Sequence, residues 1–142
     1  MKKIILAMVA VMVPLMLSAG STDFWFRHFS VEDGLSSSAV RAIMQDKYGF
    51  MWLGTDDGLN RYDGTTIKIY RLNPEGVNDY ISFLYDTTDR IWIGTGDGVY
   101  IYDYETENFE PFKLLTAKGD SIKTNVNHIA EDRDGNLWFS TV

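Results

Sequence analysis

Short apolar runs separated by Asp- and Gly-rich turns dominate the chain after residue 39, and helical periodicity never extends beyond a few residues. A first stretch places these runs at residues 40–45, 50–55, 59–62 and 66–71. A second stretch repeats the arrangement at residues 81–85, 91–95, 99–102 and 109–113. Four short strands joined by tight turns predict a four-stranded antiparallel meander in each stretch.

The motif Trp-x-Gly-Thr lies in the second run of each stretch. It begins at Trp52 and Trp92, and it starts again at Trp138 with Ser140 in place of the glycine. The tryptophans are 40 and 46 residues apart, and four-stranded repeats of this length are typical of β-propeller blades. The sequence therefore predicts an all-β chain that forms an incomplete ring of about two and a half blades. The predicted units are blade 1 at residues 40–71, blade 2 at 81–113, and the start of blade 3 at 126–142.

The repeated residues are assigned structural roles in the blade. Each tryptophan is expected to fill the wedge between adjacent blades, and the glycine two residues later leaves room for a bulky neighbour. Each Asp-Gly pair is expected to form a tight turn in which the aspartate bonds to turn amides. These positions are Trp52, Gly54, Thr55, Asp57 and Gly58, then Trp92, Gly94, Thr95, Asp97 and Gly98, then Trp138 and Thr141.

The segment 24–30 shows the aromatic alternation of a fourth strand. Phe29 precedes Trp52 by 23 residues, close to the 22 residues between Tyr70 and Trp92. We expect residues 24–30 to be a leading strand that pairs with the last blade of a complete ring and so hides an edge.

Residues 1–20 have the features of a secretory signal peptide. Lys2 and Lys3 precede an apolar run, and small residues follow at positions 18–20. An uncleaved membrane anchor is the alternative, but the run is shorter than the about 20 residues of a spanning helix and contains Pro14. The expected mature domain is residues 21–142, exported to the periplasm.

Charge and cysteine content restrict the partners. Loss of Lys2 and Lys3 with the signal peptide lowers the formal net charge from −7 to −9, and the chain has no Lys/Arg cluster. Because an acidic surface repels phosphate backbones, nucleic acid is not expected as a partner. The chain has no cysteine, so disulfides and thiolate metal sites are excluded.

Candidate catalytic chemistry is sparse. His28 and His128 lack the spacing of a zinc site, and residues 132–136 match a hairpin turn better than a calcium loop, because the later carboxylate is missing. No G-x-S-x-G motif or phosphate-binding glycine loop is present. We therefore predict no catalytic, cofactor-binding or metal residues.

Four polar or aromatic residues on loops are candidates for ligand contact. They are equally well explained by packing within the blades, so the sequence leaves both the ligand-contact and the packing interpretation open. These residues are Tyr48, Asn60, Arg61 and Tyr80.

The runs at residues 31–36, 40–55 and 58–64 together resemble the opening of two-component regulator propellers. The resemblance spans essentially all of residues 24–142, and the first blade is its most specific part. The resemblance implies the periplasmic sensor half of a hybrid two-component protein, in which propellers and an immunoglobulin-like domain precede a membrane helix, a histidine kinase, a receiver and a DNA-binding domain. It further implies oligosaccharide sensing that controls polysaccharide-utilisation genes, with inner-membrane anchoring and dimerisation through other parts of the protein.

The chain departs from this family pattern. Asp89 stands where Gly49 and Gly135 stand in the other repeats, and no kinase or DNA-binding segment follows residue 142. We therefore expect a truncated gene or partial record that is not itself an enzyme and that aggregates alone through its open strand edges. A fragment of a secreted polysaccharide lyase or hydrolase, or a protein-interaction scaffold, is the alternative.

Overall fold

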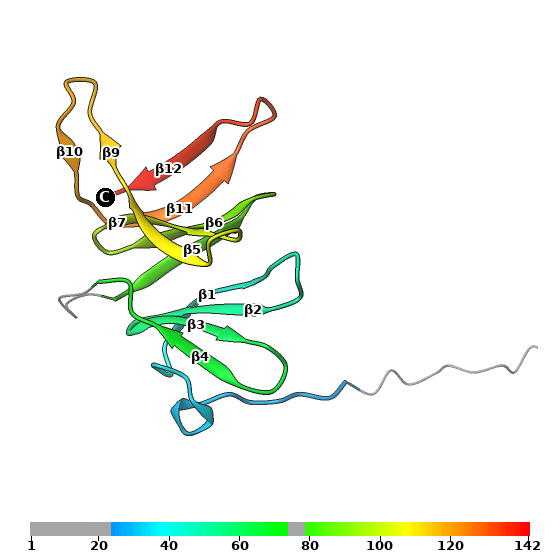
Figure 1. The fold of residues 1–142 in the computed structure, drawn as a ribbon. Helices are drawn as coiled ribbons and strands as arrows, with labels where there is room; N and C mark the ends of the chain where they lie inside the picture. Colours follow the sequence, from blue (N-terminus) through cyan, green and yellow to red (C-terminus); the bar gives the residue numbers. More distant parts are fainter. Residues whose placement is uncertain (1–23, 74–78) are drawn as a thin grey trace, which may run out of the picture.

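The computed structural model describes residues 24–73 and 79–142, which form four antiparallel sheets (Figure 1). Three of these sheets correspond to the predicted blade units and follow one another along the chain. Within each sheet the strands are neighbours in sequence order, so the predicted four-stranded meanders are confirmed. Blade 1 contains β1 (Val40–Gln45), β2 (Met51–Thr55), β3 (Gly58–Tyr62) and β4 (Ile67–Tyr70). Blade 2 contains β5 (Ile81–Asp86), β6 (Arg90–Thr95), β7 (Gly98–Asp103) and β8 (Asn108–Phe112), and the third sheet contains β11 (Val126–Glu131) and β12 (Leu137–Thr141).

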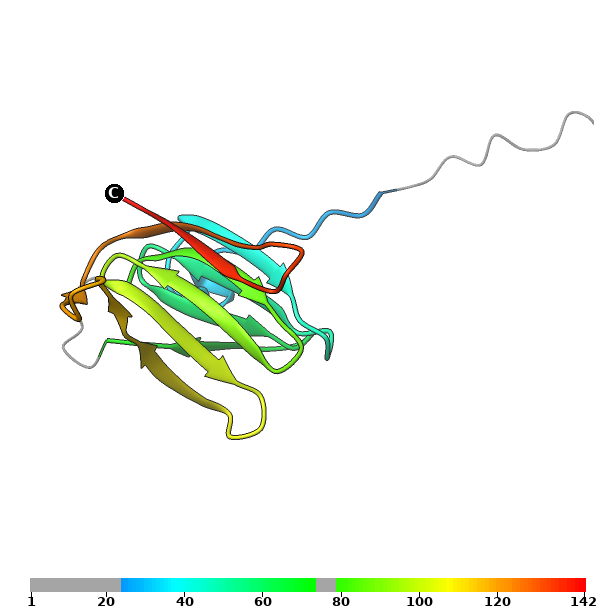
Figure 2. The ribbon, with the colours of Figure 1, turned by 90° about the horizontal axis from the view of Figure 1, so that it is seen from above.

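The blades pack through their faces, with the first strands side by side. Strand β5 lies between β1 and β11, and the sheets fan out from these strands without closing into a ring (Figures 1 and 2). A large apolar core lies between blades 1 and 2, and a smaller one lies between blade 2 and the third sheet. The first core contains Trp52, Leu59, Leu72, Ile81, Leu84, Ile91, Ile93 and Tyr102, and the second contains Trp92, Val99, Val126 and Ile129.

The same backbone irregularity recurs in each first strand. The register shifts between Val40 and Ala42 in β1, between Ile81 and Phe83 in β5, and between Val126 and His128 in β11. A bulge locally increases the twist of a strand pair. Its recurrence at one position shows that the three units are equivalent in backbone as well as in sequence.

Residues 24–30 form no strand among the described residues. Their expected partner is the last blade of a complete ring, and no such blade lies among the described residues, so the leading strand stays a prediction. The segment instead runs along the side of blade 1 that faces away from blade 2 (Figure 1). Arg27 Nη1 donates to the Tyr62 hydroxyl over 2.9 Å, and the Phe29 ring meets the Tyr62 ring edge-on at 4.9 Å.

A short 3₁₀ helix, η2 (Val31–Asp33), follows this segment. Ser30 Oγ accepts from the Glu32 amide, and Asp33 Oδ2 accepts from the Ser30 amide, which is a reciprocal capping box. The helix ends at Gly34 (φ 105°), and Leu35 is buried just after it. This segment therefore covers a face of blade 1 through turns rather than through a strand ladder.

A short hairpin lies outside the predicted blades. It consists of β9 (Leu114–Leu115) and β10 (Ser121–Ile122), links blade 2 to the third sheet, and has no counterpart between blades 1 and 2 in the described residues.

The predicted signal peptide, residues 1–20, lies outside the described residues. The part of the chain that is described contains no helix long and apolar enough to span a membrane.

Candidate functional site

The threonine of each complete Trp-x-Gly-Thr motif forms hydrogen bonds with the turn that follows it. Thr55 Oγ1 donates to the Gly58 carbonyl over 2.9 Å and accepts from the Asp57 amide over 3.1 Å. Thr95 makes the same two bonds, with Gly98 and Asp97, over 3.1 and 3.2 Å. The prediction that the Asp57 carboxylate bonds to the turn amides is therefore wrong. The threonine hydroxyl satisfies the turn, while Asp57 pairs with Arg71 over 2.6 Å.

Replacing Thr95 with valine is expected to destabilise the chain by about 1–2 kcal/mol, because the Asp97 amide and the buried Gly98 carbonyl lose their side-chain partner. Urea unfolding followed by tryptophan fluorescence measures the change. Thr95→Ser retains the hydroxyl and is the control. Equal stability of the valine and serine variants would show that the hydroxyl contributes nothing.

The tryptophans differ in burial according to what covers them. Trp52 is fully buried against blade 2, Trp92 is 9% exposed against the third sheet, and Trp138 is 65% exposed. The indole N–H of Trp52 donates to Asp46 Oδ2 over 2.7 Å, and that of Trp138 donates to Asp132 Oδ2 over 2.8 Å. Sequence reasoning missed this pairing, although an aspartate stands six residues before the tryptophan in both repeats.

The hydrogen bond from Trp138, together with those from Asn136 and the turn amides, lowers the pKa of Asp132 to about 2. Because the folded-state pKa is depressed, the stabilisation is complete above the unfolded pKa of about 3.9 and is lost as pH falls through about 2. We expect the indole N–H resonance of Trp138 to titrate with a midpoint near pH 2 in an NMR series. A midpoint near 4 would contradict the bond, and Asp132→Asn should abolish the titration.

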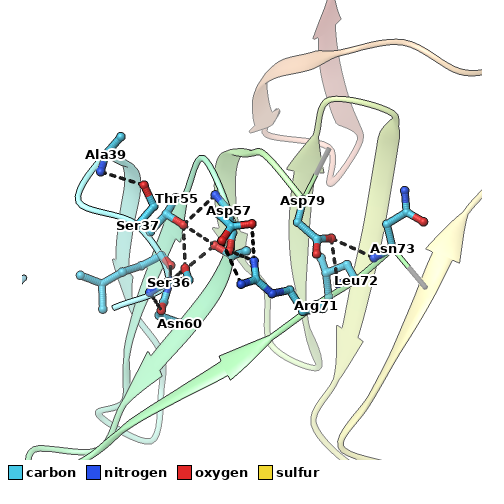
Figure 3. Close-up of polar contacts among 12 residues, drawn as sticks. Ser36, Ser37, Ala39, Thr55, Asp57, Asn60, Arg71, Leu72, Asn73 and Asp79 are labelled. Carbon is cyan, nitrogen blue, oxygen red and sulfur yellow. Dashed lines mark hydrogen bonds and ion pairs between the residues drawn. The ribbon is translucent and has the colours of Figure 1, made fainter. Parts of the chain in front are cut away.

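A polar network fixes the N-terminal segment to the β2–β3 end of blade 1 (Figure 3). Asn60 is fully buried, and its Oδ1 accepts from the Ser36 amide over 2.9 Å. Asn60 Nδ2 donates to Ser36 Oγ over 2.8 Å and to the Leu53 carbonyl over 3.1 Å. These bonds occupy the amide of Asn60, so this candidate ligand residue has a structural role.

The buried side chain of Asp79 extends this network toward blade 2 (Figure 3). Its Oδ1 accepts from the backbone amides of Leu72 and Asn73 over 3.1 and 2.9 Å. The Asp79 carbonyl accepts from the Gly58 amide over 2.8 Å. These contacts join the β2–β3 turn of blade 1 to the connection between the blades. Tyr80 lies beside this connection, where its ring faces the Arg41 guanidinium at 5.8 Å.

A cavity of 300 Å³ lies at the opposite end of strand β2, between the turns of blades 1 and 2. It brings together two of the four candidate residues, Tyr48 and Arg61. The Arg61 guanidinium lies over the Phe50 ring at 4.6 Å. The cavity is lined by Asp46, Tyr48, Phe50, Arg61, Tyr102, Tyr104 and Glu107.

Hydrogen bonds and ring contacts hold the cavity walls in place. The Tyr104 hydroxyl donates to Asp86 Oδ1 over 2.8 Å, and burial together with this bond raises the pKa of Tyr104. The Tyr48 and Tyr104 rings meet edge-on at 5.3 Å. Lys47 Nζ lies 4.3 Å from the centre of the Tyr104 ring and donates to the Thr88 carbonyl. The aromatic wall is therefore a rigid part of the boundary between the blades.

The model of the family described as two component regulator propeller matches residues 34–57 and 121–142. These two segments are therefore similar to two-component regulator propeller repeats. Histidine kinase P4 of Formosa agariphila is 56% identical to the chain over 59 residues, which cover 42% of the chain and 4% of that kinase. The match thus spans a small fraction of the length of this curated relative.

Solved structures share the fold of these propeller repeats. The extracellular domain assigned to the hybrid two component system BT3049 from B. thetaiotaomicron superposes with a TM-score of 0.67 and 30% identity, over 80% of the chain and 17% of that domain. The corresponding domain of BT4673 from B. thetaiotaomicron gives a TM-score of 0.57 and 24% identity, over 74% of the chain and 16% of that domain. The latter shows the fold alone.

Metal and acid–base groups are dispersed in the propeller repeats. Across residues 24–73 and 79–142, no three His, Cys, Asp or Glu side chains gather closely enough to hold a metal ion. The ring of His128 packs against the ring of Phe83 at 4.3 Å, while His28 lies on the N-terminal segment. In the turn at 132–136, Asp132 Oδ1 accepts from the amides of Asp134 and Asn136. The candidate site is therefore the cavity that Tyr48 and Arg61 line.

Proposed function

We propose that this chain is part of the extracytoplasmic sensor of a hybrid two-component signalling protein, and that the sensor detects oligosaccharides to control transcription of polysaccharide-utilisation genes. The observation that carries the proposal is the 30% identity to the BT3049 extracellular domain over 80% of the chain. The short match to histidine kinase P4 adds support from a signalling relative. The signalling groups would lie in other parts of the protein.

The cavity between blades 1 and 2 is compatible with ligand sensing. It combines aromatic walls with a few polar groups, as small-molecule sites commonly do. We propose that the chain binds ligand without transforming it, and that export to the periplasm and anchoring in the inner membrane depend on a signal peptide and on a separate membrane segment. No partner nucleic acid is proposed for this segment, because its net charge is −7.

A transcriptional reporter tests the proposed function. In the native host, a reporter under the control of the regulated polysaccharide-utilisation promoter should respond to oligosaccharides and should lose the response when residues 40–113 are deleted. Deletion of the same residues should leave the signalling protein present by immunoblot. An unchanged response after deletion would refute the sensor role of these repeats, and release of new reducing ends by the purified chain would favour a propeller enzyme.

A further inference from the structure

The cavity between blades 1 and 2 presents ring surface and hydrogen-bonding groups in one place. Its walls come from the β1–β2 turn and strand β3 of blade 1, and from strand β7 and the β7–β8 turn of blade 2. Its volume of 300 Å³ is at the lower end of the range of about 300–1,000 Å³ that small-molecule sites occupy. It therefore fits a short part of an extended ligand rather than a large compact one.

Tyr48 supplies the accessible apolar surface. Tyr48 is 62% exposed, and its ring is held by the edge-on contact with the Tyr104 ring. The Lys47 ammonium lies 5.1 Å from the centre of the Tyr48 ring and ties this turn to blade 2. An exposed aromatic ring held in a fixed orientation is suited to stacking against a flat apolar surface, at little cost in side-chain entropy.

Arg61 and Glu107 supply the polar groups. Arg61 makes no ion pair with a carboxylate within residues 24–73 and 79–142, and its guanidinium is oriented by the Phe50 ring at 4.6 Å. Glu107 has a backbone φ of 53°, the one positive φ among the described non-glycine residues. Glycine or asparagine adopts that conformation more readily, so a glutamate here retains a carboxylate at some conformational cost.

These groups select the class of ligand by chemistry and by charge. A guanidinium donates to hydroxyl oxygens, and a carboxylate accepts from hydroxyl hydrogens, so Arg61 and Glu107 together complement adjacent hydroxyls. The carboxylates of Asp46 and Glu107 offset the single charge of Arg61 in the lining, which disfavours an anionic ligand. A pyranose ring offers an apolar C–H face and adjacent hydroxyls, and it matches both features.

We propose that this cavity is a subsite for a neutral sugar ring of an oligosaccharide, with Tyr48 stacking on the ring and with Arg61 and Glu107 binding its hydroxyls. The proposal rests on the proposed function, because it places the binding of that function at a defined site and limits the sugar to an uncharged one.

Calorimetric titration of the purified full chain tests the subsite. The probes are gluco-, xylo-, manno- and galacto-configured neutral trisaccharides, with galacturonate and guluronate trisaccharides as anionic counterparts. We expect at least one neutral probe to bind, and Tyr48→Ala to weaken its affinity roughly tenfold or more, because hot-spot aromatics contribute on this scale. Tyr48→Phe should stay within about threefold, since the ring is kept. Trp25→Ala, at a 93% exposed aromatic outside the cavity, is the matched control and should bind as the unmodified chain does.

Hydrogen exchange provides a second measurement that does not depend on a variant. The bound neutral probe should protect the turn amides at 46–50 and 104–107, and Glu107→Gln should weaken binding without changing this footprint. Neutral binding that Tyr48→Ala leaves unchanged, or protection elsewhere, would overturn the subsite while leaving the proposed function intact. Binding of the anionic probes alone would overturn the sugar class. An absence of binding to every probe would overturn the subsite, whereas the proposed function would still stand or fall on the reporter response.

Discussion

Replacing Trp52 with alanine is expected to destabilise the chain by about 4 kcal/mol, the range measured for truncation of fully buried large aromatics. Trp52 is completely buried, and its ring lies 5.0 Å from that of Tyr102 and 6.4 Å from that of Phe109, both in blade 2. It also stacks on Tyr70 of its own blade at 5.8 Å. Its removal therefore leaves a cavity at the centre of the contact between blades 1 and 2. Urea unfolding followed by circular dichroism measures the loss.

Trp138→Ala is the matched control for that substitution. It removes the same side chain from the equivalent strand position, together with the equivalent indole bond to an aspartate six residues earlier. Because Trp138 is 65% exposed, we expect a cost of about 1 kcal/mol or less. Similar costs for the two variants would show that the repeat tryptophan stabilises its own blade rather than the contact between blades.

The fold was predictable because its signals are local and repeated. The alternation of apolar runs with Asp/Gly turns defines each meander within about 30 residues, and the recurrence of Trp-x-Gly-Thr defines the units. The leading strand at 24–30 stays a prediction, because its expected partner is the last blade of a complete ring and no such blade lies among the described residues. The capping box at Ser30 and Asp33 was a readable signal for the turn that forms nearby.

The candidate site was only partly predictable, because its residues come from different repeats. Tyr48 and Tyr104 are 56 positions apart in sequence, and only the stacking of blade 2 on blade 1 brings their rings together. Asn60 and Arg61 are adjacent in β3, yet their side chains take opposite faces of the sheet because strand residues alternate. One therefore joins the buried network at Ser36, and the other lines the cavity. The sequence alone does not show which face of the sheet each of these two side chains takes, so it could not separate their roles.

Replacing Gly54 with alanine is expected to cost about 2–3 kcal/mol, because overpacking a tight contact forces side chains or strands to move. A Cβ at Gly54 would lie 2.5 Å from Ile81 Cγ2, 2.9 Å from Ile81 Cβ and 3.3 Å from Ala42 Cβ. Ile81 is fully buried and β-branched, so it has few alternative rotamers. The added methyl would therefore push β5 of blade 2 away from blade 1. Thermal and urea unfolding measure the change against the unmodified chain.

Gly96→Ala controls for the general effect of adding a methyl to a glycine near the same turns. A Cβ there meets nothing closer than 3.8 Å, from Tyr80 Cδ1, so its effect should stay within about 0.5 kcal/mol. A double-mutant cycle with Ile81→Ala then isolates the contact. Removing Ile81 Cγ2 takes away the nearest atom, so Gly54→Ala should cost less in the Ile81→Ala background than in the original chain. Equal costs in both backgrounds would show that the strain does not come from Ile81 Cγ2, and it would then arise at the two contacts that remain, the Cβ of residue 81 at 2.9 Å and Ala42 Cβ at 3.3 Å.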